Sequence, residues 1–192
     1  MRVVQVRPDL PATNPSLPAF LDCWMAARQG DALPFDADLM ALAAERGLPT
    51  GNMALIEVRA PDLVVVRRSG SVLDAHLGFG LAGFDIMQAT AASVRATRFA
   101  RFLLNATHPC GVVVRDLALD DRRGQAVESL NLPVRGEKGE TCILSLVVGF
   151  ETRPHGRDRI MYGDFHSWID LGHGIPSVAD ELAAGRFFPK SF

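Results

Sequence analysis

Short apolar segments alternate with glycine- and proline-containing breaks along the middle of the chain. Residues 53–58 and 63–68 are apolar runs of strand length, and residues 60–62 between them, Ala-Pro-Asp, have the composition of a turn. The pattern therefore predicts two strands that pair as a hairpin. Residues 69–85, which follow, are rich in glycine and predict one or two short helical turns.

Helical periodicity occurs in three places. Residues 16–29 carry apolar side chains at spacings of three and four, residues 36–46 form a second helical segment, and a glycine follows each. Residues 88–105 contain neither glycine nor proline, so they predict the longest helix, about 27 Å at the usual rise per residue. Pro109 blocks its continuation.

Three longer strands are predicted next, at residues 110–119, 125–134 and 142–150, with short polar loops between them. Alternation in the last two strands gives each of them a mainly apolar face, formed by Glu128, Leu130, Leu132 and Val134 and by Leu144, Leu146, Val148 and Phe150. Successive strands with short connections form an antiparallel meander, which excludes a doubly wound parallel sheet.

These elements predict an α+β fold with one core, which a chain of 192 residues can readily bury. Residues 1–15, with three prolines, are expected to form an extended arm, and residues 16–152 the domain with its leading helices. Residues 153–192 are predicted to be an irregular C-terminal extension, with a capped helix as one interpretation of residues 177–184.

Several short segments mark the turns and strand starts of this arrangement. They are Phe20-Leu21-Asp22-Cys23-Trp24, Leu55-Ile56-Glu57-Val58, Arg68-Ser69-Gly70, Gly78, Leu81-Ala82-Gly83-Phe84-Asp85, Pro109-Cys110-Gly111 and Leu130-Asn131-Leu132-Pro133. Together with the element order, they make residues 17–151 resemble a PAS-type sensory domain, in particular a family of small stand-alone bacterial PAS-like proteins. The resemblance implies a five-stranded antiparallel sheet with helices over one face and a pocket that holds a ligand in some members. It implies no catalytic residues.

Two candidate functional surfaces follow. A ligand pocket is expected between the longest helix and the sheet, although an ordinary packed core would use the same side chains: Val94, Arg98, Phe99, Phe102, Leu103, Val112, Leu130, Leu132, Leu144 and Leu146. The first helix has a strongly apolar face that packs either on its own sheet or, as the resemblance implies, against a second copy of the chain. Its dimer candidates are Leu17, Phe20, Leu21 and Trp24.

Composition and charge exclude several classes of binding partner. The formal net charge of −2 gives no whole-chain attraction to nucleic acid or to anionic lipid. The chain starts without a signal-peptide pattern, and its apolar runs are far shorter than the ~20 residues that span a bilayer, so a cytoplasmic protein without a membrane partner is expected. Cys23, Cys110 and Cys142 lack the spacing of a zinc site and are expected to be buried thiols.

Two motifs with possible chemistry have simpler interpretations. Residues 78–83 match GxGxxG, but neither a preceding strand nor an acidic residue about 20 positions later accompanies them, so a dinucleotide site is not expected. Arg95, Arg98 and Arg101 repeat along the longest helix. A solvated helix face is the preferred interpretation, with an anionic ligand or a partner carboxylate as the alternative.

The histidines do not define a cofactor or metal site. His155, His166 and His173 lie 11 and 7 residues apart, unlike the close pairs of most metal sites, so structural or surface roles are preferred. The longest helix contains no histidine that would favour haem. No metal is assigned, and the cofactor is unknown.

The sequence therefore favours a non-catalytic sensory or regulatory module that binds a small molecule or a partner protein. A homodimer or a separate signalling protein would transmit the signal, because no output domain is recognisable in the chain. One alternative is a pure interaction module with a filled core. The other is a small ketosteroid-isomerase-like enzyme, for which Glu128 would supply the carboxyl group in the pocket.

Overall fold

The computed structural model describes residues 12, 14–30, 32–60, 63–119, 124–149 and 160–185. Its helices are α1 (Ser16–Ala27), α2 (Asp36–Glu45), α3 (Ser71–Leu77), α4 (Arg95–Thr107) and α5 (Val178–Gly185), with single 3₁₀ turns at η1 (Thr50–Asn52), η2 (Ile86–Ala89) and η3 (Ala92–Val94). Its strands are β1 (Met53–Ala60), β2 (Leu63–Ser69), β3 (Gly111–Leu119), β4 (Gly124–Arg135), β5 (Thr141–Val148) and β6 (Ile160–Ile169).

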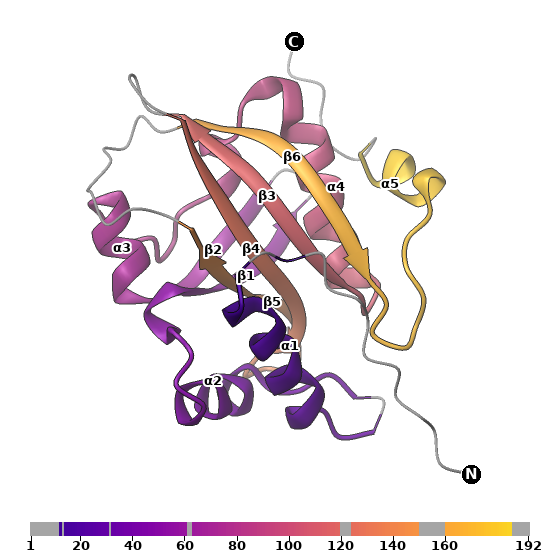
Figure 1. Ribbon diagram of the computed structural model, residues 1–192. Helices are drawn as coiled ribbons and strands as arrows, with labels where there is room; N and C mark the ends of the chain where they lie inside the picture. Colours follow the sequence, from indigo (N-terminus) through magenta and orange to yellow (C-terminus); the bar gives the residue numbers. More distant parts are fainter. Residues whose placement is uncertain are drawn as a thin grey trace.

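The six described strands form one antiparallel sheet in the order β2-β1-β5-β4-β3-β6 (Figure 1). The predicted β1–β2 hairpin and the β3–β4–β5 meander are both confirmed. Two long-range pairings complete the sheet, because β1 lies beside β5 and β6 lies beside β3. The α+β class and the antiparallel sheet are therefore as predicted, and β6 is an additional strand.

Helices cover both faces of this sheet, whereas the resemblance implied one covered face (Figure 1). On one face, α1 and α2 pack on the alternate leucines of β4 and β5. On the other, α3, η2 and α4 pack on β1, β2 and β5. The strand alternation explains the division, because neighbouring residues such as Ile143 and Leu144 enter opposite cores.

The longest predicted helix is shorter than expected, since α4 begins at Arg95 and not at residue 88. Local side-chain hydrogen bonds close the preceding turn instead. Asp85 accepts from the N–H of Met87 at 3.0 Å, and the Thr90 hydroxyl donates to the carbonyl of Ile86 at 2.9 Å. Such bonds offer the backbone an alternative to a continuous helix, so η2 and η3 replace its first turns.

The predicted irregular tail was wrong for residues 160–169, which form β6 in the main sheet (Figure 1). Residues 178–185 form α5 beside it, which agrees with the capped helix that the sequence offered as one interpretation of residues 177–184. A serine–aspartate cap begins α5, as the sequence indicated, because the Ser177 hydroxyl and the Asp180 carboxylate bond to each other's backbone N–H. The predicted arm at residues 1–15 lies almost entirely outside the described residues.

Two glycines of the segments that mark turns and strand starts have specific backbone roles. Gly83 has a φ of +84°, which favours glycine, and its N–H donates to the Val66 carbonyl at 2.8 Å. The Val66 N–H in turn donates to Phe84 at 3.0 Å, so residues 83–85 lie along the outer edge of β2. At Gly111 a Cβ atom would lie 3.0 Å from the side chain of Leu132, so this position is a close approach.

Candidate functional site

The predicted pocket residues are divided between the two faces of the sheet. Phe99 and Phe102 of α4 lie in the core beneath that helix, and Leu103 packs against it. Strand alternation places Val112 on the same face, and Val94 is half-buried in η3. The four leucines of the expected pocket pack under α1 and α2 instead: Leu130, Leu132, Leu144 and Leu146. The expected pocket is therefore not assembled, because its four leucines point to the face opposite α4.

The face beneath α4 is polar where the sequence predicted leucines. Cross-strand pairing aligns Ser145, Asn131, Val112 and Trp168 in one row, and Val147, Ser129, Val114 and His166 in the next. The helix contributes a stripe of three long polar side chains at spacings of three and four, namely Arg98, Arg101 and Asn105. We call Arg98, Arg101, Asn105, Asn131 and His166 the polar layer.

The predicted solvent-exposed arginine face was wrong for two of its three members. Arg98 and Arg101 are each only 3% exposed, while Arg95 is half-buried and donates to the Thr90 carbonyl at 3.0 Å. Desolvating a guanidinium is costly unless anionic or polar groups compensate it. Two buried arginines on one short helix therefore require polar or anionic groups around them.

Asn105 gives the polar layer a hydrogen-bond acceptor with a defined direction. Its Nδ2 donates to the Cys110 carbonyl at 2.6 Å and to the Asn131 carbonyl at 3.5 Å, which fixes the orientation of the amide. The Oδ1 atom is buried and accepts no hydrogen bond from any residue that the structure describes. A buried polar atom of this kind calls for an explanation, and a bound donor is one.

At the α5 end of the layer, β6 presents two donors to one carboxylate. Trp168 Nε1 donates to Glu181 Oε1 at 2.7 Å, and His166 Nε2 lies 3.3 Å from Glu181 Oε2. The two rings pack edge to face, with centroids 5.3 Å apart. Burial lowers the pKa of His166 and the positive charge of Arg101 lowers it further, while Glu181 opposes both effects.

This shift predicts a stability change with pH. The unfolded chain binds a proton to His166 near the ordinary imidazole pKa of 6.5, whereas the folded chain resists it. The free energy of unfolding should therefore fall as the pH drops below 6.5, before the carboxylates titrate. Urea unfolding at pH 7, 6 and 5 should show that the free energy of unfolding decreases less in His166→Gln than in the wild type. Equal slopes in the two proteins would assign the decrease to another group.

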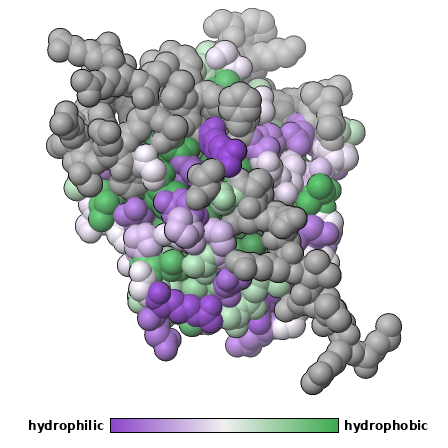
Figure 2. Space-filling model, in the orientation of Figure 1, coloured by the Kyte–Doolittle hydropathy of each residue, from purple (hydrophilic) through white to green (hydrophobic). Residues whose placement is uncertain are grey.

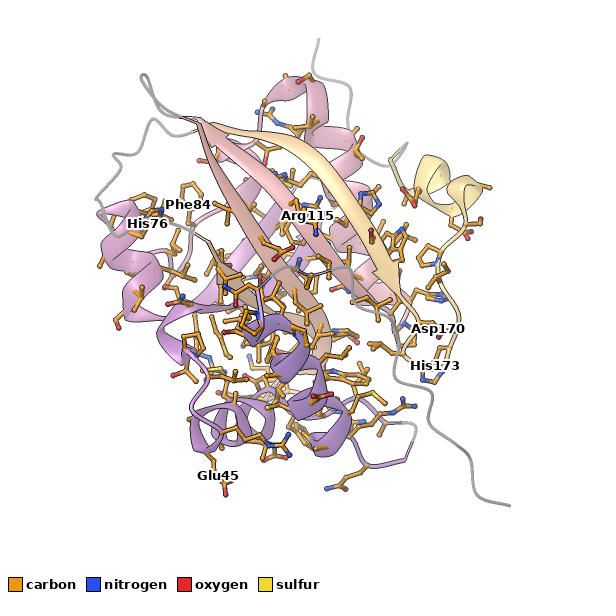
Figure 3. All side chains as sticks on the ribbon, viewed as in Figure 1. Glu45, His76, Phe84, Arg115, Asp170 and His173 are labelled. Atoms are coloured by element: carbon orange, nitrogen blue, oxygen red, sulfur yellow. The ribbon has the colours of Figure 1, made fainter. Side chains whose placement is uncertain are left out.

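The acidic candidate for the enzyme alternative lies on the opposite face. Glu128 shares its strand face with Leu130 and the core under α1, as alternation predicted. Its carboxylate accepts from Arg115 Nε at 3.0 Å and from the Asn14 N–H at 3.2 Å. Figure 3 shows Arg115 on that side of the sheet. The carboxylate takes part in an ion pair there and is not directed into a pocket beneath α4.

The dimer candidates on α1 are core residues of the chain itself. Leu17, Phe20, Leu21 and Trp24 are at most 1% exposed, and Trp24 Nε1 donates to the Pro133 carbonyl at 2.8 Å. They offer no surface to a second copy, so this assignment is corrected. On the face that α1 and α2 cover, hydrophilic and hydrophobic residues are intermixed at the surface (Figure 2).

The remaining motifs have structural roles. Gly78 of the GxGxxG match ends α3 with a left-handed φ of +76°, and the motif follows this helix and not a strand. Asp74 accepts from the Ser69 hydroxyl and from the Leu81 N–H, which fixes the turn after α3. The three cysteines are buried and free, as predicted, and burial raises the pKa of each thiol.

A separate shallow pocket of about 360 Å³ lies at the hairpin end of the sheet. Its lining combines two arginines with aliphatic side chains: Arg59, Leu63, Val65, Val66, Arg67 and Gly83. Both arginines have acidic neighbours, because Arg59 pairs with Glu57 at 2.7 Å and Arg67 pairs with Glu140. The pocket shares no residue with the pocket that the sequence predicted.

Comparison of the chain with protein-family models, with curated proteins and with solved structures gave no match. Among the described residues, no helix is long and apolar enough to cross a membrane. In the same part of the chain, His, Cys, Asp and Glu side chains form no group of three that could hold a metal ion. The polar layer is therefore assigned as the candidate site from its own geometry.

The sequence analysis singled out Arg98, Arg101 and His166 of the polar layer but did not bring them together, and it missed Asn105 and Asn131. Trp168 and Glu181, next to the layer, were overlooked because they lie in the C-terminal extension, where β6 was not predicted. Asn131 carried a detectable signal, since an amide in the middle of an apolar strand must satisfy four hydrogen-bonding positions. The regular leucines next to it led to the opposite face being chosen as the pocket.

Proposed function

We propose that this chain is a non-catalytic sensory or regulatory module of the PAS type, which binds a small polar molecule in the polar layer. The order of its elements, from the hairpin through the short helices and α4 to the meander, supports the PAS-like assignment. Binding of a small molecule between a helix and the sheet is the activity that best suits the buried polar side chains there. A second protein would carry the output.

The observation on which this proposal depends is the burial of Arg98, Arg101 and Asn105 on one face of α4. A helix that only closed a core would present apolar side chains to the sheet, as the Phe99 side of α4 does. Polar groups that are kept in a buried position are common at ligand sites, where a few convergent donors and acceptors set specificity. The Asn105 Oδ1 atom would receive a donor from the ligand.

Native mass spectrometry of freshly purified protein, with its ultraviolet–visible spectrum, tests this function. We expect a retained small-molecule mass on the wild type. Asn105→Ala should lose that mass, or bind the identified molecule at least tenfold more weakly, because it removes the acceptor. Ser93→Ala is the matched control, since Ser93 is exposed just before the same helix and should retain the ligand.

A wild-type protein with no retained mass, and no thermal stabilisation by a library of small polar metabolites, would contradict ligand binding. A defined complex with another protein would then support the alternative of an interaction module with a filled core. Equal loss of ligand from Asn105→Ala and from Ser93→Ala would place the binding site outside the polar layer.

A further inference from the structure

Helix α5 is held in place by other parts of the chain. It contains eight residues, and an isolated helix of that length is unstable in water. It packs against α4, where Ala184 is 5% exposed, and lies beside β6 (Figure 1). Its Ser177–Asp180 cap is internal to the segment and contributes nothing to this attachment. The position of α5 therefore depends on its contacts with α4 and β6.

Glu181 makes the polar contact between α5 and the sheet. Its two carboxylate oxygens receive separate donors, Trp168 Nε1 at 2.7 Å and His166 Nε2 at 3.3 Å. The donors are two residues apart on one strand, so both point to the same face.

The chemistry of this contact is selective for a carboxylate. An indole N–H is a donor only, and it forms its shortest bonds with charged acceptors. Arg101 lies close enough to His166 for its positive charge to lower the pKa of that residue. Two donors and a nearby cation match a planar anion with two oxygens, whether it comes from a side chain or from a ligand.

The connection from β6 to α5 is fixed at its start. Asp170 Oδ1 accepts from the N–H groups of Gly172 and Gly174, at 2.7 and 2.9 Å, and Arg28 donates to the Leu171 carbonyl at 2.6 Å. Figure 3 shows Asp170 and His173 together in this loop. Beyond Gly174 comes Ile175, which is 54% exposed. Movement of α5 about this point would leave the anchored half of the loop unchanged.

We propose that Trp168 and His166 form a carboxylate-binding site whose resting occupant is Glu181, and that a small carboxylate ligand replaces Glu181 and releases α5. This inference rests on the proposed sensory function and specifies its ligand class and its moving element. Because α5 covers α4 next to the polar layer, its release would change the surface that a partner protein contacts. Occupancy of the site would thereby be converted into a change of shape.

Chemical rescue with acetate tests the proposal. Trp24 and Trp168 are the two tryptophans of the chain, so a ¹H–¹⁵N NMR spectrum contains two indole signals. The Trp168 signal is the one that disappears in Trp168→Phe. Glu181→Ala should shift this signal, and sodium acetate should move it back toward the wild-type position. The Trp24 signal, with its bond to Pro133, should stay in place and serves as the internal reference.

The wild type should respond to acetate only at concentrations at least tenfold higher than Glu181→Ala, since the tethered carboxylate competes. At those concentrations hydrogen exchange should rise in residues 178–185. Sodium chloride at equal ionic strength should have neither effect. Asp180→Ala is the matched control, because it weakens the cap of α5 but keeps Glu181, so acetate should not shift its Trp168 signal at the concentrations that rescue Glu181→Ala.

A folded Glu181→Ala protein whose Trp168 signal ignores acetate would overturn the inference and leave Glu181 as a purely structural contact. If that variant does not fold, the wild-type exchange measurement decides, and unchanged protection of residues 178–185 in acetate would overturn it. Neither result bears on whether a ligand mass is found on the wild-type protein. The proposed function is therefore tested separately from this inference.

Discussion

Trp24→Ala should lower the free energy of unfolding by about 3–5 kcal/mol, the range for removing a large aromatic side chain from a packed core. Trp24 is fully buried between α1 and the sheet. Its loss would also leave the Pro133 carbonyl without the indole donor that lies 2.8 Å away. A loss of this size is a large share of the total stability of a single domain. Urea unfolding followed by circular dichroism would measure it.

Two variants make this result specific. Trp24→Phe keeps most of the buried area and removes the N–H, so its effect should be clearly smaller. Gln29→Ala changes an exposed residue just after α1 and should lie within about 0.5 kcal/mol of the wild type. A Trp24→Ala protein with wild-type stability and a smaller oligomeric state would contradict the assignment of α1 to the core and restore it as a dimer surface.

Gly70→Ala should be destabilising by about 3 kcal/mol or more, at the upper end of the usual cost of overpacking. Gly70 joins β2 to α3, and its N–H donates to the Met53 carbonyl at 2.8 Å. An added Cβ would lie 2.7 Å from the Cα atom of Gly51 and closer still to the Gly51 carbonyl. Because the obstacle is backbone, no side-chain rotation relieves it. The thermal unfolding midpoint and urea unfolding would report the change.

Gly80→Ala is the matched control for this effect. Gly80 lies in the same connecting region, has no positive φ, and a Cβ there would meet no atom within 4 Å. Alanine at such a position restricts the unfolded chain, so stability should change by no more than about 1 kcal/mol. Equal destabilisation by both substitutions would show that the region responds to the loss of glycine in general, and not to the contact with Gly51.

The sheet was predictable because its signals are local. Alternation in β4 and β5 reported which residues share a face, and Glu128, Leu130 and Leu132 do share one. Alternation does not report which helix covers that face. The pocket prediction failed at this step, since the leucines belong to the core under α1 and not to the layer under α4.

The second prediction that failed concerned the burial of charged side chains. The arginines of α4 have the spacing of a solvated helix face, and the sequence alone cannot show that α5 and β6 lie alongside it. The strand β6 was missed for a related reason. As the last strand in the order it carries polar residues such as His166 and Ser167, so its hydrophobic pattern is weak.

The segment along β2 limits how this protein can polymerise. Residues 83–85 occupy the backbone groups of Val66 that would otherwise be available to another strand. Of the two ends of the strand order, this leaves β6 as the place where a further strand could be added. Two chains joined there would each turn a blocked β2 edge outward. At the described residues, strand addition is therefore hindered at the β2 edge, so this edge is a poor place for native molecules to join into a fibre.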